Sequence, residues 1–141
     1  MRTQSRLAVA AATALTTAAL ATATAGAEVT SVSVAAGPEG LVTGCAYTVT
    51  AVITDATVPP NSVFFMVAGG VIPGNGERLP GTPIHHPDSN TVTLSWTPTR
   101  QGAQNLVAVR SVPGEYTSTQ YIPVEVRGAG LNTGSSCLPL P

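Results

Sequence analysis

The stretch Cys-Ala-Tyr-Thr-Val-Thr-Ala-Val-Ile-Thr, residues 45–54, decides the fold class of this chain. Apolar side chains occupy every second position from Cys45 to Ile53, and Ala, Thr or Val stands between them. A period of two is typical of a β-strand that buries one face and exposes the other. The stretch therefore predicts a strand, and its threonines mark the side that faces solvent.

The same alternation recurs along the chain. Further runs occupy residues 31–34, 63–67, 91–96, 106–108 and 122–126, and glycine or proline clusters separate them at 37–40, 59–60, 69–70 and 113–114. β-branched residues dominate these runs, as a pleated and half-buried surface prefers. No helical period is visible, so the pattern predicts an all-β sandwich or barrel.

Two segments lack the alternation. Residues 68–90 contain five glycines and four prolines, and a loop of that length is uncommon in a compact domain. We therefore expect one or two short edge strands within it, near Val71–Ile72 and Arg78–Leu79. The glycine- and serine-rich tail after Arg127 is predicted to be irregular chain. Pro123, which has no N–H to donate, predicts that the last strand lies at a sheet edge.

The run Leu94-Ser95-Trp96-Thr97-Pro98, followed by Gly102 and then by Leu106-Val107-Ala108, resembles the strand–corner–strand segment of bacterial immunoglobulin-like domains. Residues 45–54 and 63–65 resemble their second and third strands, so the likeness covers most of residues 29–127. It implies an immunoglobulin-like β-sandwich of about seven strands in two antiparallel sheets. Trp96 falls on the fifth strand rather than on the third, where antibody-type domains carry it. Sandwiches of this kind host many unrelated functions, so the likeness does not name a ligand.

The first residues predict export. Arg2 and Arg6 precede an uncharged stretch, and Ala25-Gly26-Ala27 ahead of Glu28 is a small-x-small cleavage site. We expect a signal peptide over residues 1–27 and one mature domain over 28–141, with no membrane span after cleavage. An uncleaved membrane anchor is the alternative, but few large aliphatic residues stand in this stretch to hold it in a bilayer. The predicted location is secreted, either extracellular or associated with the cell wall.

The two cysteines are predicted to pair. In the expected sandwich the start of the second strand and the end of the seventh lie at the same end of the molecule. Cys45 opens the second strand and Cys137 follows the last one, so a Cys45–Cys137 disulfide would tie down the tail over residues 128–141. An exported chain meets oxidising conditions that permit this bond. Two free thiols, or an intermolecular bond, are the alternative.

The sequence predicts a protein that is not an enzyme and needs no cofactor. It shows no Gly-x-Ser-x-Gly elbow, no paired carboxylates and no glycine-rich loop leading into a helix. His85, His86 and Asp88 have the residue types of a metal site, and Glu77 is the nearest acid in the sequence before them. Adjacent residues on an extended chain point to opposite sides, which favours a polar loop over a metal site or a histidine-based hydrolase.

The charge of the chain argues against nucleic acid as a partner. The net charge of −1 becomes −3 when Arg2 and Arg6 are removed with the leader. The remaining four arginines face seven acidic residues, and the chain contains no lysine. Binding to a phosphate backbone requires clustered cations, which are missing from this sequence.

The two outer faces of the predicted sandwich differ. One is coated with hydroxyl groups: Ser31, Ser33, Thr48, Thr50, Thr54, Thr91, Thr93 and Ser95. On the sheet formed by the third, sixth and seventh strands, parity sends an apolar set outward: Phe64, Met66, Val107, Val109 and Tyr121. Five exposed apolar side chains on three neighbouring strands form a patch large enough to indicate a contact surface.

We therefore expect this face to bind an extracellular protein or a cell-envelope partner, or to support weak self-association. The alternative is that residues 68–90 fold over the face, with Val71, Ile72, Leu79 and Ile84 on their underside, and that the domain is a passive spacer of the envelope. A protease inhibitor that presents the 68–90 loop is a third hypothesis.

Overall fold

Two β-sheets contain all the strands of the computed structural model, which describes residues 26–68 and 76–141. The four-stranded sheet has the order β1-β3-β7-β6. Its strands are β1 (Val29–Ala35), β3 (Tyr47–Ile53), β7 (Thr91–Trp96) and β6 (Ile84–His86). They pair antiparallel throughout, and a short 3-10 turn, Pro87–Ser89, connects β6 to β7.

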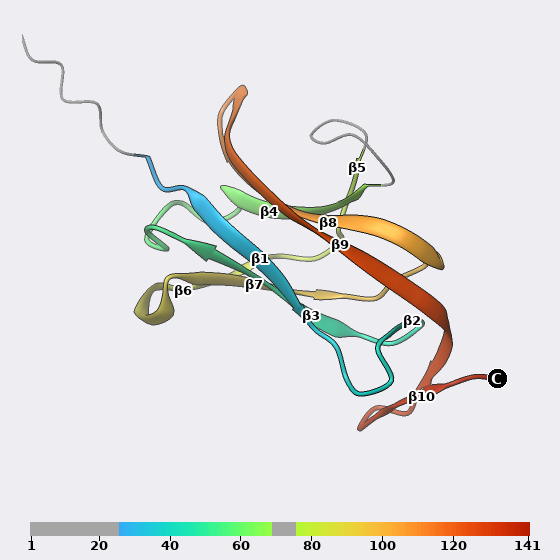
Figure 1. Ribbon diagram of the computed structural model, residues 1–141. Coiled ribbons are helices and arrows are strands. Elements are labelled where there is room, and N and C mark those ends of the chain that lie inside the picture. Colours follow the sequence, from blue (N-terminus) through green and yellow to red (C-terminus); the bar gives the residue numbers. More distant parts are fainter. Residues whose placement is uncertain (1–25, 69–75) are drawn as a thin grey trace, which may run out of the picture.

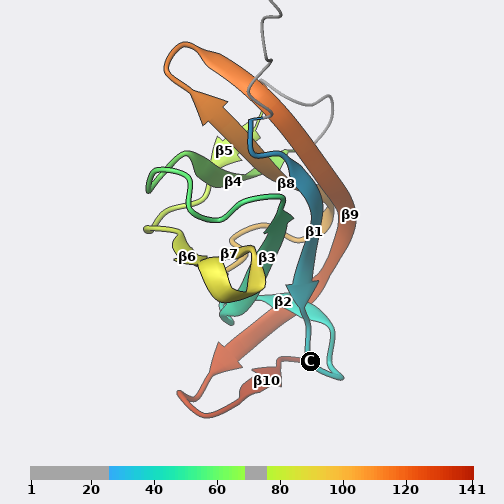
Figure 2. The same ribbon diagram turned by 90° about the vertical axis from the view of Figure 1, so that its left-hand side faces the viewer.

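The six-stranded sheet has the order β10-β9-β8-β4-β5, with β2 added against β9. Its strands are β4 (Val63–Ala68), β5 (Gly76–Arg78), β8 (Gly102–Val112), β9 (Glu115–Asn132), β10 (Cys137–Pro139) and β2 (Leu41–Thr43). Figure 1 shows the tip of the β8–β9 hairpin and the strand β10 at opposite ends of the molecule. Figure 2 shows β9 running the length of the domain beside β1.

The predicted all-β sandwich is confirmed. Each of the six alternating runs forms a strand, and β1, β3 and β7 share one sheet while β4, β8 and β9 share the other. This distribution of strands is that of an immunoglobulin-type sandwich. The hydroxyl-bearing positions of β1, β3 and β7 are exposed or half-buried, as parity predicts. β9 as a whole is not the edge strand that was expected, because β10 and β2 pair with its C-terminal part. At Pro123, however, β9 pairs only with Asn105 of β8 among the described strands.

Several local expectations need correction. The chain after Arg127 is not irregular, because β9 continues to Asn132 and turns back into β10. The six-stranded sheet is not wholly antiparallel, because β2 pairs parallel with β9. Both differences arise at the small residues Gly128, Ala129 and Gly130. These residues show no apolar alternation in the sequence, but their lack of large side chains lets neighbouring strands approach the backbone closely.

The 68–90 segment contains two short strands among its described residues, in line with the one or two that were expected. The strand expected near Arg78–Leu79 is β5, which ends at Arg78, and the Leu79 amide then donates to the Phe65 carbonyl at 2.9 Å. The expected strand at Val71–Ile72 lies outside the described residues. Strand β6, which had no sequence signal, pairs with β7 in the opposite sheet.

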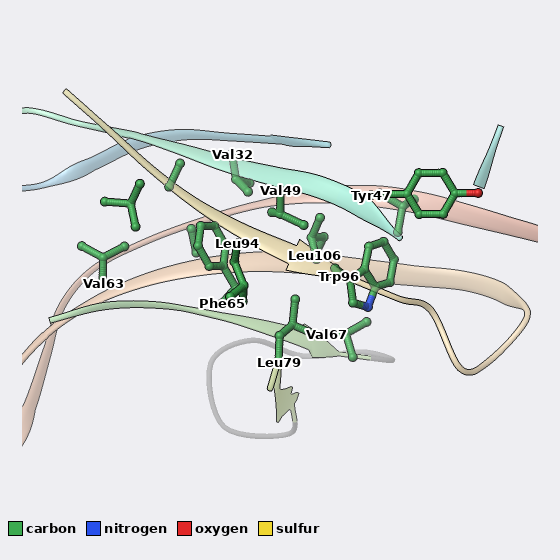
Figure 3. Close-up of a cluster of buried hydrophobic side chains, with 14 of the residues drawn as sticks. Val32, Tyr47, Val49, Val63, Phe65, Val67, Leu79, Leu94, Trp96 and Leu106 are labelled. Atoms are coloured by element: carbon green, nitrogen blue, oxygen red, sulfur yellow. The ribbon is translucent and has the colours of Figure 1, made fainter. Parts of the chain in front are cut away.

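The inter-sheet core is formed by the inward residues of both sheets (Figure 3). Val32, Val49 and Leu94 enter it from one sheet, and Phe65 and Leu106 enter from the other. Phe65 and Leu106 are completely buried. Burial of such side chains contributes roughly 1.5–3 kcal/mol each relative to exposure, which makes this layer the main source of stability.

Cys45 and Cys137 form the predicted disulfide, with 5.8 Å between their Cα atoms. The bond joins the chain before β3 to the first residue of β10 across 92 residues of sequence. Beside it, the Tyr47 hydroxyl accepts a hydrogen bond from the Val42 amide at 2.9 Å and donates to the Gly40 carbonyl at 3.1 Å. The disulfide and Tyr47 together hold β2 and β10 at one end of the sandwich.

Gly130 lies against the disulfide. A Cβ at this position would stand 2.5 Å from the Val42 Cγ2 and 2.9 Å from the Cys45 Sγ. Gly128, two residues earlier in the same strand, has no atom within 4 Å of the equivalent position. The close approach of β9 to the cystine therefore requires glycine at position 130 and not at 128.

The double variant Cys45→Ser/Cys137→Ser is expected to unfold more easily than the oxidised protein. Opening a loop of this length removes about 4–5 kcal/mol of stability in the chain-entropy model. Urea unfolding of the double variant and of the oxidised and reduced wild-type protein measures the loss. A difference smaller than about 1 kcal/mol would contradict a structural role for the bond.

Gly130→Ala is expected to lower the free energy of unfolding by about 1–3 kcal/mol, because the added methyl group overfills the space beside the cystine. Gly128→Ala is the matched control and should change stability by no more than about 0.5 kcal/mol. Thermal unfolding of both variants tests this contrast. Equal effects of the two substitutions would rule out the steric explanation.

Candidate functional site: a groove at the hairpin end

The predicted apolar face exists, but it is mostly covered. Phe64, Met66, Val107 and Val109 lie on the outer side of the six-stranded sheet and form, with Ala68, a cluster separate from the main core. Each of these side chains is at most 9% exposed. Tyr121 is 58% exposed. The expected exposure is therefore wrong for four of the five residues, and their role in binding stays a prediction.

The residues expected to cover this face do not all do so. Leu79 is buried in the main core, because the chain after β5 remains bonded to β4 and turns inward. Ile84 is 60% exposed and belongs to β6 in the opposite sheet. Val71 and Ile72 lie outside the described residues. The expectation of a single flap with Leu79 and Ile84 on its underside is wrong.

Phe64 lies between a cation and an aromatic ring. The guanidinium carbon of Arg78 is 4.6 Å from the centroid of the Phe64 ring. The Tyr116 ring approaches with a centroid distance of 5.9 Å and an interplanar angle of 58°. Both arrangements are favourable, since the face of the ring is electron-rich and its edge is not. The three side chains come from β4, β5 and β9.

A β-bulge places Tyr116 beside Phe64. Arg110 pairs with Ser118, but the next residue, Ser111, pairs with Tyr116, which leaves Thr117 as the extra residue. Strict alternation from Tyr121 would turn Tyr116 toward the core. The bulge reverses the parity of the residues before it and turns the ring outward. Sequence alternation does not show a bulge, so this residue was missed.

Phe64, Arg78 and Arg110 line a groove of about 820 Å³ at the hairpin end of the sheet. Residues 59–62, between β3 and β4, form one wall, and residues 111–116, the tip of the β8–β9 hairpin, form the other. The Ser111 amide donates to the Ser62 carbonyl at 2.8 Å, which ties the walls together. The hairpin turns at Pro113-Gly114, where Gly114 has a φ of 84°. A groove of this size is within the usual range for ligand sites.

The loop that forms the first wall is ordered by its own side chains. The Asp55 carboxylate accepts from the Thr57 hydroxyl at 2.6 Å and from the Thr57 amide at 2.9 Å. These hydrogen bonds lower the pKa of the exposed Asp55 carboxyl group, and the bond from the Thr57 hydroxyl has the larger effect. The turn is therefore held at pH values above the ordinary pKa of Asp55, and its contribution is lost as pH falls through the lowered pKa.

The groove carries two arginines and one acid. Arg78 and Arg110 have no ion-pair partner in the described part of the chain, which contains all seven acidic residues. The one ion pair found there joins Arg100 to Glu77 at 3.5 Å, and Glu115 is the acid that lines the groove.

Arg110 is unusual because it is buried. Only 8% of the residue is exposed, and its Nη1 donates to the Ser111 carbonyl while its Nε has no partner among the described residues. A buried guanidinium without a carboxylate is costly unless its remaining donors are satisfied. Arg110 pairs with the core residue Val63, so its side chain lies on the inner side of the sheet, whereas Arg78 pairs with Met66 on the outer side.

The two histidines are not brought together with a third ligand. His86 Nε2 lies 2.9 Å from the Thr93 hydroxyl, while His85 Nδ1 lies 3.3 Å from the Ala56 carbonyl. Within residues 26–68 and 76–141, no group of three His, Cys, Asp or Glu side chains could hold a metal ion. Both rings therefore act within local hydrogen-bond networks of β6.

Comparison with protein-family models, curated proteins and solved structures finds no match to this chain. Over the described residues, no helix is long and apolar enough to cross a membrane.

Proposed function

We propose that this protein is a secreted, non-catalytic, immunoglobulin-like module that binds an extracellular protein through the hairpin end of its six-stranded sheet. The observation that carries the proposal is the groove between residues 59–62 and 111–116, with Phe64 held between Arg78 and Tyr116 at its floor. Aromatic and arginine side chains gathered in a concave site are typical of binding surfaces. The burial of Phe64 and Met66 moves the proposed surface from the flat face to its end.

The exposed aromatic residues of β9 support this location. Tyr116 is 54% exposed beside the groove, and Tyr121 is 58% exposed on the flat part of the same sheet. Tyrosine offers a large contact area and a hydroxyl group at a low entropic cost of ordering. The two tyrosines lie at different places on the same strand. Substituting each one in turn therefore distinguishes binding at the groove from binding at the flat face.

A passive structural module is the second candidate. The burial of Val107 and Val109, together with that of Phe64 and Met66, favours it, because a sealed sheet face needs no partner. A protease inhibitor has less support. Residues 76–78 and 84–86 form strands in two different sheets, so the segment does not present itself as one loop.

Export is supported by the disulfide and by the start of the fold. Cys45–Cys137 is the kind of bond that persists in an oxidising compartment. The proposed cleavage between Ala27 and Glu28 falls one residue before β1, so it leaves every strand intact. The Glu28 carbonyl still accepts from the Thr54 amide at 2.9 Å.

Expression of the full chain in a secreting bacterial host is expected to yield an exported protein that begins at Glu28 and contains one disulfide. N-terminal sequencing and intact mass, with and without reduction, measure both properties. A replacement of Ala25 and Ala27 by large residues is the control and should block processing. An exported chain that retains residues 1–27 would contradict the signal-peptide assignment.

Affinity capture from the culture filtrate of the source organism tests the binding role. The wild-type protein and the Tyr121→Ala and Leu138→Ala variants are expected to retain the same partner. Tyr116→Ala should lose it, because that ring forms the side of the groove. Leu138 is 51% exposed in β10 at the opposite end and serves as the matched control.

Other outcomes decide between the candidates. Loss of the partner with Tyr121→Ala alone would return the binding surface to the flat face. Loss with Leu138→Ala alone would place it at the disulfide end. No partner shared by the wild-type protein and its control variant would favour the passive structural module.

A further inference from the structure

Arg78 points to the chemistry of the ligand. It is exposed on β5 and rests on the Phe64 ring, on the outer side of the sheet. The neighbour of Arg78 in sequence, Glu77, is engaged by Arg100 at 3.5 Å. The alternation of β5 sends Glu77 and Arg78 to opposite sides, so this acid is not available to the groove.

A carboxylate is the anion that Arg78 suits. A guanidinium presents its N–H donors as a planar fork that matches the two oxygens of a carboxylate. No acid of the chain forms an ion pair with Arg78 within the described residues, which include all seven acids and Glu115 of the groove itself. An external carboxylate would therefore provide the missing charge.

The rest of the groove is suited to apolar groups beside that carboxylate. Pro59 and Pro60 stand on one wall, and Val112, Pro113 and Tyr116 stand on the other. Val112 and Tyr116 remain 38% and 54% exposed, so the groove is open along the hairpin. An open groove accepts a chain that continues beyond it, whereas a small acid would leave these apolar walls uncovered.

We propose that the groove binds an extended peptide segment of the partner in which an Asp or Glu side chain is flanked by apolar residues. The acidic side chain pairs with the guanidinium of Arg78, and the apolar neighbours pack against the prolines and Tyr116. The proposal rests on the binding function above and names the chemistry that its site recognises.

Fluorescence anisotropy with blocked, labelled peptides tests this assignment on the exported, oxidised protein. One peptide carries a single central Glu between Leu and Pro residues, and the other carries Gln in its place. We expect the Glu peptide to bind about tenfold to a hundredfold more tightly, as the loss of a charge-assisted hydrogen bond predicts. Equal binding of the two peptides, or no binding at millimolar concentrations, would overturn the proposal.

Three arginine variants locate the effect. Arg78→Gln is expected to weaken binding of the Glu peptide at least about tenfold, and Arg78→Lys should have a smaller effect because it keeps the charge. Arg100→Gln is the matched control, since Arg100 is an exposed arginine outside the groove, and it should leave binding unchanged. If Arg100→Gln weakened peptide binding as much as Arg78→Gln does, the effect would be explained by the net charge of the protein. That result would overturn the assignment.

The contact with Arg78 is also tested without substitution. In the ¹H–¹⁵N spectrum the Nε–Hε signal of Arg78 should shift with the Glu peptide and not with the Gln peptide. Competition by benzoate separates the two sources of a carboxylate. Benzoate that binds as tightly as the peptide would identify a small organic acid as the ligand and overturn the peptide assignment.

The same variants distinguish a failure of this inference from a failure of the binding function. Suppose that Tyr116→Ala loses the partner and Arg78→Gln retains it in full. The groove would then remain the binding site, but it would not recognise a carboxylate. A partner that is retained by Tyr116→Ala would remove the groove itself.

Discussion

Strand β9 hydrogen-bonds to β8 from Glu115 to Val126, and the two ends of this pairing carry the distinctive features of the domain. At the hairpin end, the bulge at Thr117 turns Tyr116 toward Phe64 and completes the groove. At the other end, β9 continues past β8 and supplies an edge to β2 and β10. An unbulged β9 would not turn Tyr116 toward Phe64, and a β9 that ended with β8 would offer no edge to β2 and β10.

Different interactions hold the two ends of the domain. The disulfide, the buried Tyr47 hydroxyl and the close packing of Gly130 hold β2, β9 and β10 together. The groove depends on one backbone hydrogen bond between its walls and on the stack of Arg78, Phe64 and Tyr116. Noncovalent walls of this kind can adjust to a ligand, whereas the cross-linked end cannot adjust as readily.

Much of the architecture was predictable because strand alternation is a local property. Each apolar residue of β3 that faces the core is visible as every second position, and the same holds for β7. Predicting the disulfide required only the order of the strands and the ends at which the cysteines stand. The site was less predictable. Parity placed Phe64 and Met66 on the correct face, but the exposure of a side chain depends on neighbours distant in sequence.

The amino-acid sequence by itself determined the main strands of an all-β fold, because their alternation is a local property of the chain. The assignment of these strands to two sheets, and the Cys45–Cys137 pairing expected from it, came from the resemblance to immunoglobulin-like domains. The tertiary structure decided what alternation does not show: the bulge that turns Tyr116 outward, the burial of four of the five predicted face residues, and the meeting of Arg78 with Phe64 in the groove. These features arise where segments far apart in sequence come into contact, and their geometry depends on the packing of the whole domain rather than on any one strand.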